Sequence, residues 1–415
     1  MQFVADFHLH SKYSRATSQK MDLENLDRWA KIKGILVLGT GDFTHPLWFQ
    51  ELKEKLEIAE PGLFTLKKSE NKTRFILTTE VSCVYFKKGK QRKIHLIIFS
   101  PSLEICEKIN NYLKLYGNLA ADGRPTLSLD AKELLKIILN ISEDCLLVCA
   151  HAWTPWFGVF GSKSGFDSLE ECFEDYTKYI YSIETGLSSD PPMNWRLSSL
   201  DRITLISCSD AHSPSKIGRE ANIFNCQLSY FEIIKAIKEK DKNKFLYTIE
   251  FFPEEGKYHY DGHRNCGISF SPKETKKYNG ICPICGKPLT IGVLSRVEKL
   301  ADRPEGFVPE NAIPFKSLIP LEEIIADVLG KGAGTIEVEK EYEKLIEKFE
   351  NEFNVLINVQ ISDLEVVTLP EISEGIMRVR EGKVFIEPGY DGVYGKIRIF
   401  QSGEEKRVSR QGTLF

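Results

Sequence analysis

The chain has 415 residues, which is too long for one ordinary hydrophobic core, so we expect two or three domains. Hydrophobic residues make up 42% of it and charged residues 27%, as in a soluble globular protein. No apolar run is long enough to span a membrane, and the first residues lack the pattern of a signal peptide. The formal net charge of −4 does not indicate a nucleic-acid partner, but clustered carboxylate ligands of metal ions would inflate the acidic total. The composition therefore argues against a membrane protein. Whether the protein binds nucleic acid must be judged from local sequence patterns.

The ten cysteines give an indication of the cellular compartment. Most are scattered through strand-like and helix-like segments. Four of them, Cys83, Cys145, Cys149 and Cys208, lie in apolar runs, as small core residues do. This usage is typical of a reducing environment, so we expect a cytoplasmic protein.

Short apolar runs alternate with helix-like segments up to about residue 250. We predict seven strands, at Phe3–Phe7, Ile35–Leu38, Phe75–Thr78, Ile94–Ile98, Leu146–Cys149, Tyr179–Ile183 and Ile203–Ile206. The runs are almost continuously apolar, as expected for a buried parallel sheet. Helical periodicity lies between most of them, for example at Asp22–Lys33 and at Leu129–Leu139, the latter opened by Ser128 as a candidate N-cap.

Side chains that bind metal ions follow these strands. His8 and His10 alternate on the first strand, so both imidazoles lie on the same face. The full set, in chain order, is His8, His10, Asp42, His45, Glu80, His95, His151, Asp210 and His212. In an open sheet the outer strand ends would lie far from the inner ones. The pattern therefore predicts a closed α/β barrel with its site at the carboxyl ends of the strands.

Nine candidate ligands exceed what one ion can use, so the sequence predicts a cluster of two or three divalent ions. Mixed histidine and carboxylate ligands suit Zn, Mn, Fe or Mg. Glu80 is placed to bridge two ions, and we expect it to act with His8, His10 and Asp210 as the catalytic group. Such clusters clamp an attacking hydroxide and a leaving oxygen, so the reaction class indicated is phosphoester hydrolysis.

This ordered set resembles the polymerase-and-histidinol-phosphatase (PHP) superfamily over roughly residues 1–250. The resemblance implies a distorted (β/α)7 barrel with a trinuclear metal site. The chain departs from the pattern at Asp42-Phe43, where many members have Asp-His, and at Ser14-Arg15, where some have another histidine. The third metal site is therefore left open. His45 is either a ligand or a loop histidine that precedes Pro46.

A second candidate metal site follows the barrel. His263 and Cys266 form a His-x2-Cys arm, and Cys282 and Cys285 form a Cys-x2-Cys-Gly knuckle, which is the spacing of a zinc ribbon. His259 is the alternative to His263 as the fourth ligand. Without an open position this zinc would be structural and would replace a core that so short a segment cannot build.

The remaining chain is mixed in character. We predict helices at Leu321–Leu329 and Glu337–Phe353, and short strands at Val355–Ile361 and Lys383–Glu387. The glycine-rich turn Gly330–Thr335 is either a helix C-cap and linker, the favoured reading, or a set of backbone amides that lie against a phosphate. The expected organisation is α/β overall. It comprises a PHP barrel at 1–250, a zinc-ribbon module at 251–295, and a mixed α+β C-terminal region at 296–415 that serves DNA binding or an accessory role.

The combination of this barrel with a Glu-Glu-Gly-Lys-Tyr-His-x-Asp-Gly-His-Arg-x-Cys segment and a Cys-Pro-x-Cys-Gly-Lys-Pro-Leu-Thr knuckle resembles the endonuclease Q family of archaeal and bacterial DNA repair enzymes. The resemblance spans nearly the whole chain. It implies incision of DNA on the 5′ side of a deaminated base (hypoxanthine, uracil or xanthine) or an abasic site. The products would carry a 3′-hydroxyl and a 5′-phosphate.

An enzyme that senses deaminated bases must extrude the nucleotide and contact its Watson–Crick edge. Two loops have residues suited to stacking or hydrogen bonding, or else these residues only pack the loops on the barrel. The candidates are Trp153, Trp156, Phe157 and Lys163 in the first loop, and Asp190, Asn194, Trp195 and Arg196 in the second. Glu184, at a strand end, is a further candidate, either near the metal cluster or as a helix-capping acid.

Other functions remain to be separated. A small-molecule phosphatase of the histidinol-phosphatase kind could use the same barrel, but it would need neither a zinc ribbon nor the long C-terminal region. A binding module with an inactive barrel is disfavoured by the nearly complete ligand set. We expect DNA, single- or double-stranded and damaged, as the partner. The final residues Gln411, Leu414 and Phe415 resemble, incompletely, the tail by which repair enzymes dock on the sliding clamp, and the alternative is a frayed terminus.

Overall fold

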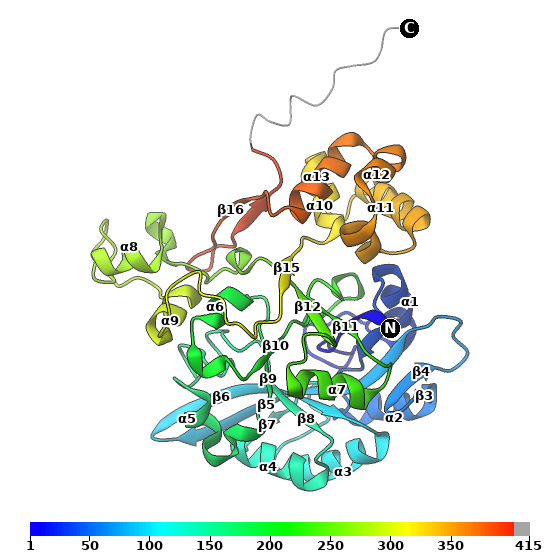
Figure 1. The fold of residues 1–415 in the computed structure, drawn as a ribbon. Helices are drawn as coiled ribbons and strands as arrows, with labels where there is room; N and C mark the ends of the chain where they lie inside the picture. Colours follow the sequence, from blue (N-terminus) through cyan, green and yellow to red (C-terminus); the bar gives the residue numbers. More distant parts are fainter. Residues whose placement is uncertain (402–415) are drawn as a thin grey trace.

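The structure is a computed structural model, and it describes residues 1–401. A curled 13-stranded sheet forms the lower part of the molecule, and smaller helical and ribbon-like parts lie above it (Figure 1). The main path of the sheet runs β10 (Thr204–Ile206), β9 (Ser182–Glu184), β8 (Leu146–Cys149), β6 (Lys90–Ser100), β5 (Arg74–Lys87), β2 (Val37–Gly39), β1 (Gln2–Asp6), β11 (Ala221–Asn225), β12 (Phe245–Glu250) and β15 (Phe315–Ser317). Three strands pair off this path, namely β3 (Leu56–Glu60), β4 (Leu63–Leu66) and β7 (Thr126–Leu127).

The curl brings the segment after β10 back to β1. Leu9 and Ala211 form a parallel bridge, and the backbone N–H of His10 donates to the carbonyl of Ala211 at 3.0 Å. The buried carboxylate of Asp6 accepts from the backbone N–H groups of Ser209 and Gly218, at 3.0 and 2.9 Å. The barrel-like architecture expected from the sequence is therefore confirmed, with its closure made by these contacts rather than by a continuous ladder.

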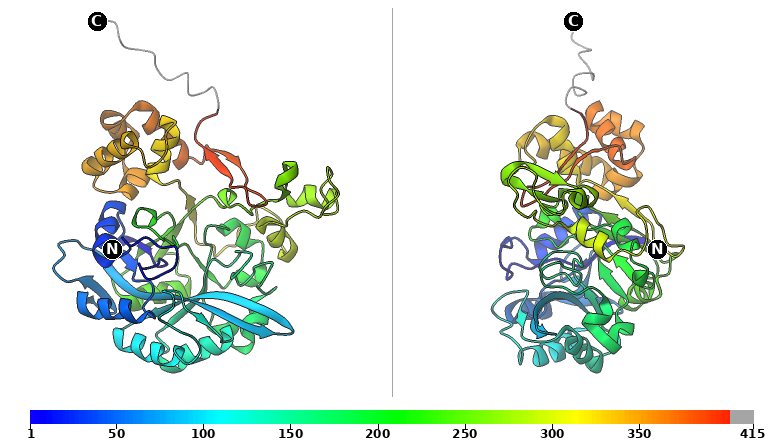
Figure 2. Two further views of the ribbon diagram at one scale, coloured as in Figure 1. Left: turned by 180° about the vertical axis from the view of Figure 1, so that it is seen from behind. Right: turned by 90° about the vertical axis from the view of Figure 1, so that its left-hand side faces the viewer.

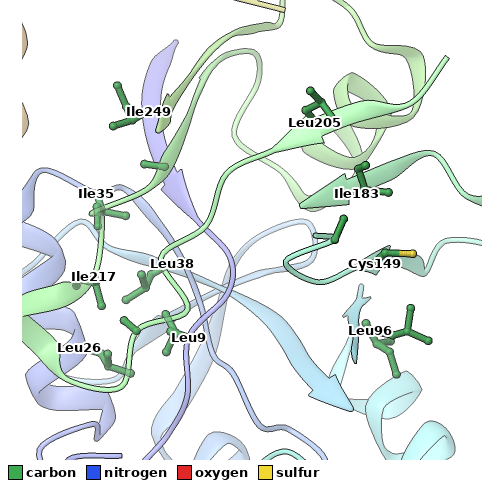
Figure 3. Packing of buried hydrophobic residues seen from close by; sticks show 14 of the residues in the cluster. Leu9, Leu26, Ile35, Leu38, Leu96, Cys149, Ile183, Leu205, Ile217 and Ile249 are labelled. Carbon is green, nitrogen blue, oxygen red and sulfur yellow. The ribbon is translucent and has the colours of Figure 1, made fainter. Parts of the chain in front are cut away.

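All seven predicted strands are present, but the prediction of a parallel sheet is wrong in part. β5 and β6 form a long antiparallel hairpin, β6 also pairs antiparallel with β8, and β1 pairs antiparallel with β11. The apolar runs suggested parallel strands because these strands are buried on both faces, as parallel strands usually are. On β6, for example, Ile97 and Phe99 belong to one core cluster and Leu96 and Ile98 to the other. The close view of the larger cluster shows its side chains coming from several strands and from α1 (Leu23–Lys33) (Figure 3).

Helices cover the sheet, and none within residues 1–401 is long and apolar enough to cross a membrane. Besides α1, they are α2 (Pro46–Lys55), α3 (Leu103–Leu113), α4 (Ala131–Ile141), α5 (Leu169–Phe173), α6 (Pro191–Trp195) and α7 (Tyr230–Glu239). The first predicted helix is confirmed, with Asp22 as its N-cap. The second begins later than expected, because Asp130 and not Ser128 accepts a backbone hydrogen bond from the first turn.

The ribbon module projects from the sheet (Figure 2). It contains the hairpin of β13 (Asp261–His263) and β14 (Ile268–Phe270), followed by α8 (Pro272–Lys277) and then by α9 (Val293–Leu300). One ligand atom from each of His263, Cys266, Cys282 and Cys285 lies within 4.8 Å of the others. The four predicted zinc ligands therefore lie together, and His263 rather than His259 is in the group.

The surroundings of the Cys282 sulfur favour its ionised form, the thiolate. Desolvation acts against ionisation, but the backbone N–H groups of Cys285 and Ile284 point at the sulfur and lower the pKa of Cys282 to about 7. A thiolate is the form that binds zinc, so the knuckle suits the metal it is predicted to hold.

A late hairpin fastens this module. β16 (Phe385–Glu387) and β17 (Lys396–Arg398) are joined by a loop in which Asp391 accepts from the backbone N–H of Arg264 at 2.7 Å and from the Thr290 hydroxyl at 2.6 Å. Tyr390 bridges to Tyr260 in the same region. The module is thus held by residues more than a hundred positions further along the chain.

The region that follows β15 is helical. It contains α10 (Leu321–Leu329), α11 (Ile336–Phe349), α12 (Ile361–Val367) and α13 (Pro370–Arg380). Gly330 caps α10 in the left-handed conformation, as the favoured interpretation of the glycine-rich turn had it. The predicted strand at Val355–Ile361 is wrong, because Asn354–Asn358 is a π-helix whose Val355 and Leu356 are buried within the helical bundle. The strand predicted at Lys383–Glu387 is confirmed as β16.

One buried ion pair joins this helical region to the sheet region. Lys33 at the end of α1 donates to Glu352 at 2.6 Å, and both side chains are almost fully buried. Glu352 also accepts from the Tyr342 hydroxyl at 2.7 Å and from the backbone N–H of Leu321 at 3.1 Å. One carboxylate therefore connects α1, α10 and α11.

Replacing Lys33 by Met should destabilise the protein by about 3–5 kcal/mol, because Glu352 would remain buried without its cation. Urea unfolding at neutral pH measures the change. The matched control is Lys31→Met, which removes an exposed lysine from the same helix and should leave the unfolding midpoint nearly unchanged. Equal unfolding midpoints for the two variants would contradict the predicted contribution of the Lys33–Glu352 pair to stability.

Replacing Cys282 by Ser should remove one zinc ion per chain, because three donors do not complete a tetrahedral site. Elemental analysis of the dialysed protein gives the stoichiometry. Cys226→Ser, at a buried cysteine outside the four-residue group, is the control and should keep the wild-type zinc content. Unchanged zinc in the Cys282 variant would refute the ribbon site.

Candidate metal centre

Two histidines at the end of β1 are held in matching ways. The Nδ1 atom of His8 lies 3.0 Å from a Glu184 carboxylate oxygen, and Nδ1 of His10 lies 3.0 Å from an Asp42 oxygen. All four residues are buried. A carboxylate behind each imidazole fixes its tautomer and orientation, which leaves Nε2 to face the centre of the site.

Glu80 and Asp210 provide the carboxylates at that centre. Nε2 of His10 lies 3.2 Å from Glu80 Oε2 and 3.3 Å from Asp210 Oδ1. Nε2 of His8 lies 3.5 and 3.8 Å from the same two oxygens. Two imidazole nitrogens and two carboxylate oxygens therefore converge on one small region.

The second oxygen of Glu80 faces another pair of histidines. Oε1 lies 2.7 Å from Nδ1 of His95 and 3.0 Å from Nε2 of His151. The hairpin register explains this, because Ser82 is directly opposite His95, so Glu80 is a diagonal neighbour of His95 on the same face. Glu80 thus lies between two pairs of histidines and presents one oxygen to each pair.

The two donor groups fit divalent ions. His8, His10 and Asp210 form one set with ligand atoms within 4.8 Å, and Glu80, His95 and His151 form another. Within residues 1–401, Nε2 of His8, Nε2 of His10 and Oδ1 of Asp210 are buried without a hydrogen-bond partner. Buried polar atoms are rarely left in this state, so the donors are suited to a ligand that accepts their lone pairs.

The electrostatics of the cluster point the same way. Burial disfavours the charged form of His8, but the carboxylates of Glu184, Glu80 and Asp210 outweigh it and raise the pKa of His8 well above its ordinary value. Burial would raise the pKa of Glu80, yet His95, Arg124 and His8 hold it well below the ordinary range. The buried carboxylates stay ionised and need positive charge beside them, from protons or from metal ions.

Strained backbone conformations occur at three of these site residues. Asp42, His151 and Asp210 have positive φ angles of 49°, 28° and 46°, which non-glycine residues rarely adopt. Gly186 is required beside His151, because a Cβ there would lie 2.6 Å from the His151 Cβ and φ is already 61°. Such conformations persist only where the surrounding structure enforces them, and they are frequent at functional sites.

Three predicted ligands lie outside the two donor groups. Asp42 accepts from the Ser11 backbone N–H and hydroxyl, at 2.7 Å each, in addition to its contact with His10. His45 stacks on Tyr13 with ring centroids 4.5 Å apart. His212 lies at the edge, its ring 4.7 Å from that of His10 and its Nδ1 2.9 Å from the Asp210 carbonyl. Asp42 therefore supports the His10 ring, and His212 lies beside His10 and Asp210.

The first predicted loop divides into a buried and an exposed part. Trp153 is fully buried, and its indole N–H donates to Asn194 at 2.8 Å, so this pair joins the two loops and has no face to offer a base. Trp156 is 52% exposed, with the Lys93 ammonium 5.1 Å from its ring. Phe157 packs on His95 at 4.2 Å, and Lys163 is exposed. Trp156 and Lys163 are therefore exposed, and Phe157 is partly exposed beside His95.

The second predicted loop serves mainly to hold elements together. Asp190 is the N-cap of α6, Trp195 packs against Phe315 at 5.7 Å, and Arg196 donates to Glu298 of α9 at 2.6 Å. Glu184 supports His8 and also accepts from the His151 backbone N–H at 2.6 Å, so it is neither a ligand in a donor group nor a helix cap.

Several residues near the site were not found from the sequence. Arg124 donates to Glu80 at 2.9 Å, and Arg219 donates to the Ser209 carbonyl beside Asp210 at 2.8 Å. Arg219 also lines a cavity of about 560 Å³, together with Thr154, Pro155, Leu187, Tyr258 and Tyr394, among others. Asp122-Gly-Arg-Pro125 and the glycine-rich Pro388–Gly395 were the available sequence signals, but neither has a metal-ligand pattern.

Comparison with known proteins extends these observations. A family model described as the MJ0043 C-terminal domain matches residues 320–383. The uncharacterized protein MJ0043 of Methanocaldococcus jannaschii is 38% identical over 255 residues, which is 60% of this chain but only 31% of that protein. The uncharacterized protein YqxK of Bacillus subtilis is 29% identical over 419 residues, covering 96% of this chain and 99% of that protein.

Two solved structures match over nearly the whole length. The lesion-specific endonuclease PfuEndoQ of Pyrococcus furiosus has a TM-score of 0.87 and 32% identity, covering 99% of this chain and 98% of that chain. A complex of endonuclease Q with a 27-mer duplex substrate that has an abasic lesion at the active site has a TM-score of 0.85 and 32% identity, covering 99% of both chains. The chain therefore belongs to the endonuclease Q family of metal-dependent DNA endonucleases, as its sequence predicted.

Proposed function

We propose that this protein hydrolyses the phosphodiester bond on the 5′ side of a damaged nucleotide in DNA. The damage is an abasic site or a deaminated base (hypoxanthine, uracil or xanthine), and the products carry a 3′-hydroxyl and a 5′-phosphate. The observation that carries the proposal is Glu80, whose two oxygens face two separate donor groups in a chain that matches a lesion-specific endonuclease over its full length.

We further propose that His8, His10 and Asp210 hold one divalent ion and that Glu80, His95 and His151 hold another, with Glu80 shared. Ions of this kind polarise a phosphodiester and lower the pKa of bound water to about 7. Asp42 and Glu184 keep the first two imidazoles in the required tautomer. The burial of the cluster keeps bulk water away from these charges, which strengthens their interactions.

The damaged nucleotide is proposed to leave the duplex and enter the cavity beside Arg219. The volume of about 560 Å³ falls within the usual range of small-molecule pockets. Thr154, which lines this cavity, lies 2.9 Å from the His151 ring, so the cavity adjoins the donor groups. Trp156 is exposed and follows Pro155 of the cavity lining, and we propose that it stacks on a neighbouring base, a contact of about 1–3 kcal/mol.

Replacing Asp210 by Asn should abolish incision, because its buried oxygen faces both histidines of the first donor group. Binding of the same DNA should change only a few-fold, since the rest of the surface is intact. The assay uses end-labelled duplexes with one abasic site, hypoxanthine or uracil, together with Mg²⁺ or Mn²⁺.

Three controls sharpen this assay. Undamaged duplex tests lesion specificity, and a phosphomonoester tests the alternative of a small-molecule phosphatase. Asp144→Asn changes an exposed acid outside the site and should incise like the wild type. Retained incision by the Asp210 variant at matched metal content would overturn the assignment of the centre.

The proposed partner of the C-terminal tail is the sliding clamp, which would raise the effective concentration of the enzyme on DNA. The residues concerned, Ser409–Phe415, lie outside those that the structure describes. A chain that ends at Arg410 should lose binding to the purified clamp and keep lesion incision. If the full-length and shortened chains bind the clamp with equal affinity, the tail is not the docking element.

A further inference from the structure

Arg124 reaches from the surface into the metal centre. Its guanidinium donates to Glu80 Oε2 at 2.9 Å, the same oxygen that faces Nε2 of His8 and of His10. The side chain of Glu80 is fully buried, whereas that of Arg124 is 27% exposed. The guanidinium therefore spans the boundary between the buried carboxylate and solvent.

The turn that presents Arg124 is fixed on both sides. The backbone N–H of Gly123 donates to the Tyr13 carbonyl at 3.1 Å, and the Pro125 carbonyl accepts from the Ser82 N–H of β5 at 2.9 Å. A side chain on Gly123 would collide with Asp42 and Ser14, so the turn packs directly against the support of His10. A guanidinium held by such a turn needs little reorganisation to meet a ligand.

Arg124 is the basic side chain that pairs with the carboxylates of the donor groups. Among residues 1–401, it is the one lysine or arginine whose side chain forms an ion pair with Glu80 or Asp210. Its hydrogen bond to Glu80 uses one of the five N–H donors of a guanidinium. If Glu80 helped to hold a metal ion, the remaining N–H donors of Arg124 would be free to bind a second anion.

We propose that Arg124 binds a non-bridging oxygen of the scissile phosphate and stabilises the charge that builds there during hydrolysis. This inference rests on the proposed function. Because the guanidinium is 27% exposed and contacts Glu80 Oε2, an anion that approaches this oxygen from the side of Arg124 would meet it. Arginine suits the role better than lysine, because its planar fork can contact Glu80 and a phosphate oxygen at once.

The first test compares Arg124→Met with Arg124→Lys under single-turnover conditions on duplex with one abasic site. Loss of one preorganised donor should slow incision about 100-fold in the Met variant, with part of the rate restored by Lys. Arg15→Met is the matched control, because Arg15 contacts Asp122 of the same turn but is 82% exposed and makes no contact with the cluster. It should incise like the wild type.

The second test separates phosphate contact from a structural countercharge. Metal content by elemental analysis should be the same in the Met variant and the wild type. Equilibrium binding in Ca²⁺ should weaken for the wild type when a methyl group replaces one non-bridging oxygen of the scissile phosphate. It should not weaken further for the Met variant, and the same methyl group elsewhere in the duplex should affect both proteins equally.

The inference is overturned if the Met variant incises at the wild-type rate, if it loses metal, or if the methyl group at the scissile phosphate weakens binding of both proteins equally. Failure of the wild type to incise lesion DNA would contradict the proposed function instead, and the binding comparison would still test Arg124.

Discussion

The structure depends on one buried carboxylate that has no access to water. Glu80 is ionised, fully buried, and surrounded by nitrogen atoms of His8, His10, His95, His151 and Arg124. A buried charge is tolerated only when partners compensate for its lost hydration. The partners come from the end of β1, from β6, from the segment after β8 and from the turn before β7, so the curl of the sheet is what assembles them.

A second set of residues makes this arrangement specific. Glu184 holds both the His8 ring and the His151 backbone, while Asp42 holds the His10 ring. These supports occupy the Nδ1 side of each β1 histidine, so each presents Nε2 to the centre. The strained φ angles of Asp42, His151 and Asp210 show that local conformational preference is sacrificed to this geometry. The arrangement of the donor atoms therefore depends on these supporting residues as well as on the donors themselves.

The structure brings most of the predicted ligands together because they follow apolar runs, and each run became a strand. The sequence could not separate donors from supports, since Asp42 and Glu184 have the same chemistry as ligands and differ only in what lies beyond them. Arg124 was missed because its partner Glu80 lies 44 positions away in the chain. The false strand at Val355–Ile361 has a physical reason as well, because β-branched residues buried in a helical bundle resemble a strand in composition.

The ribbon module and the loops around the metal centre line one common cavity. The cavity next to Arg219 has walls from the sheet loops, from residues 251–259 at the start of the ribbon module and from the β16–β17 loop, which contributes Tyr394. That loop is fixed by the backbone N–H of Gly395, which donates to Glu255 at 3.0 Å, and by Asp391 on the ribbon. Lys257 lies between the rings of Tyr258 and Tyr394, 5.8 and 5.6 Å from their centroids. Three parts of the chain therefore build the walls of this cavity. The Cys/His group of the ribbon and the two donor groups of the proposed metal centre are therefore separate in chemistry, but the cavity proposed to receive the nucleotide has walls from both parts of the chain.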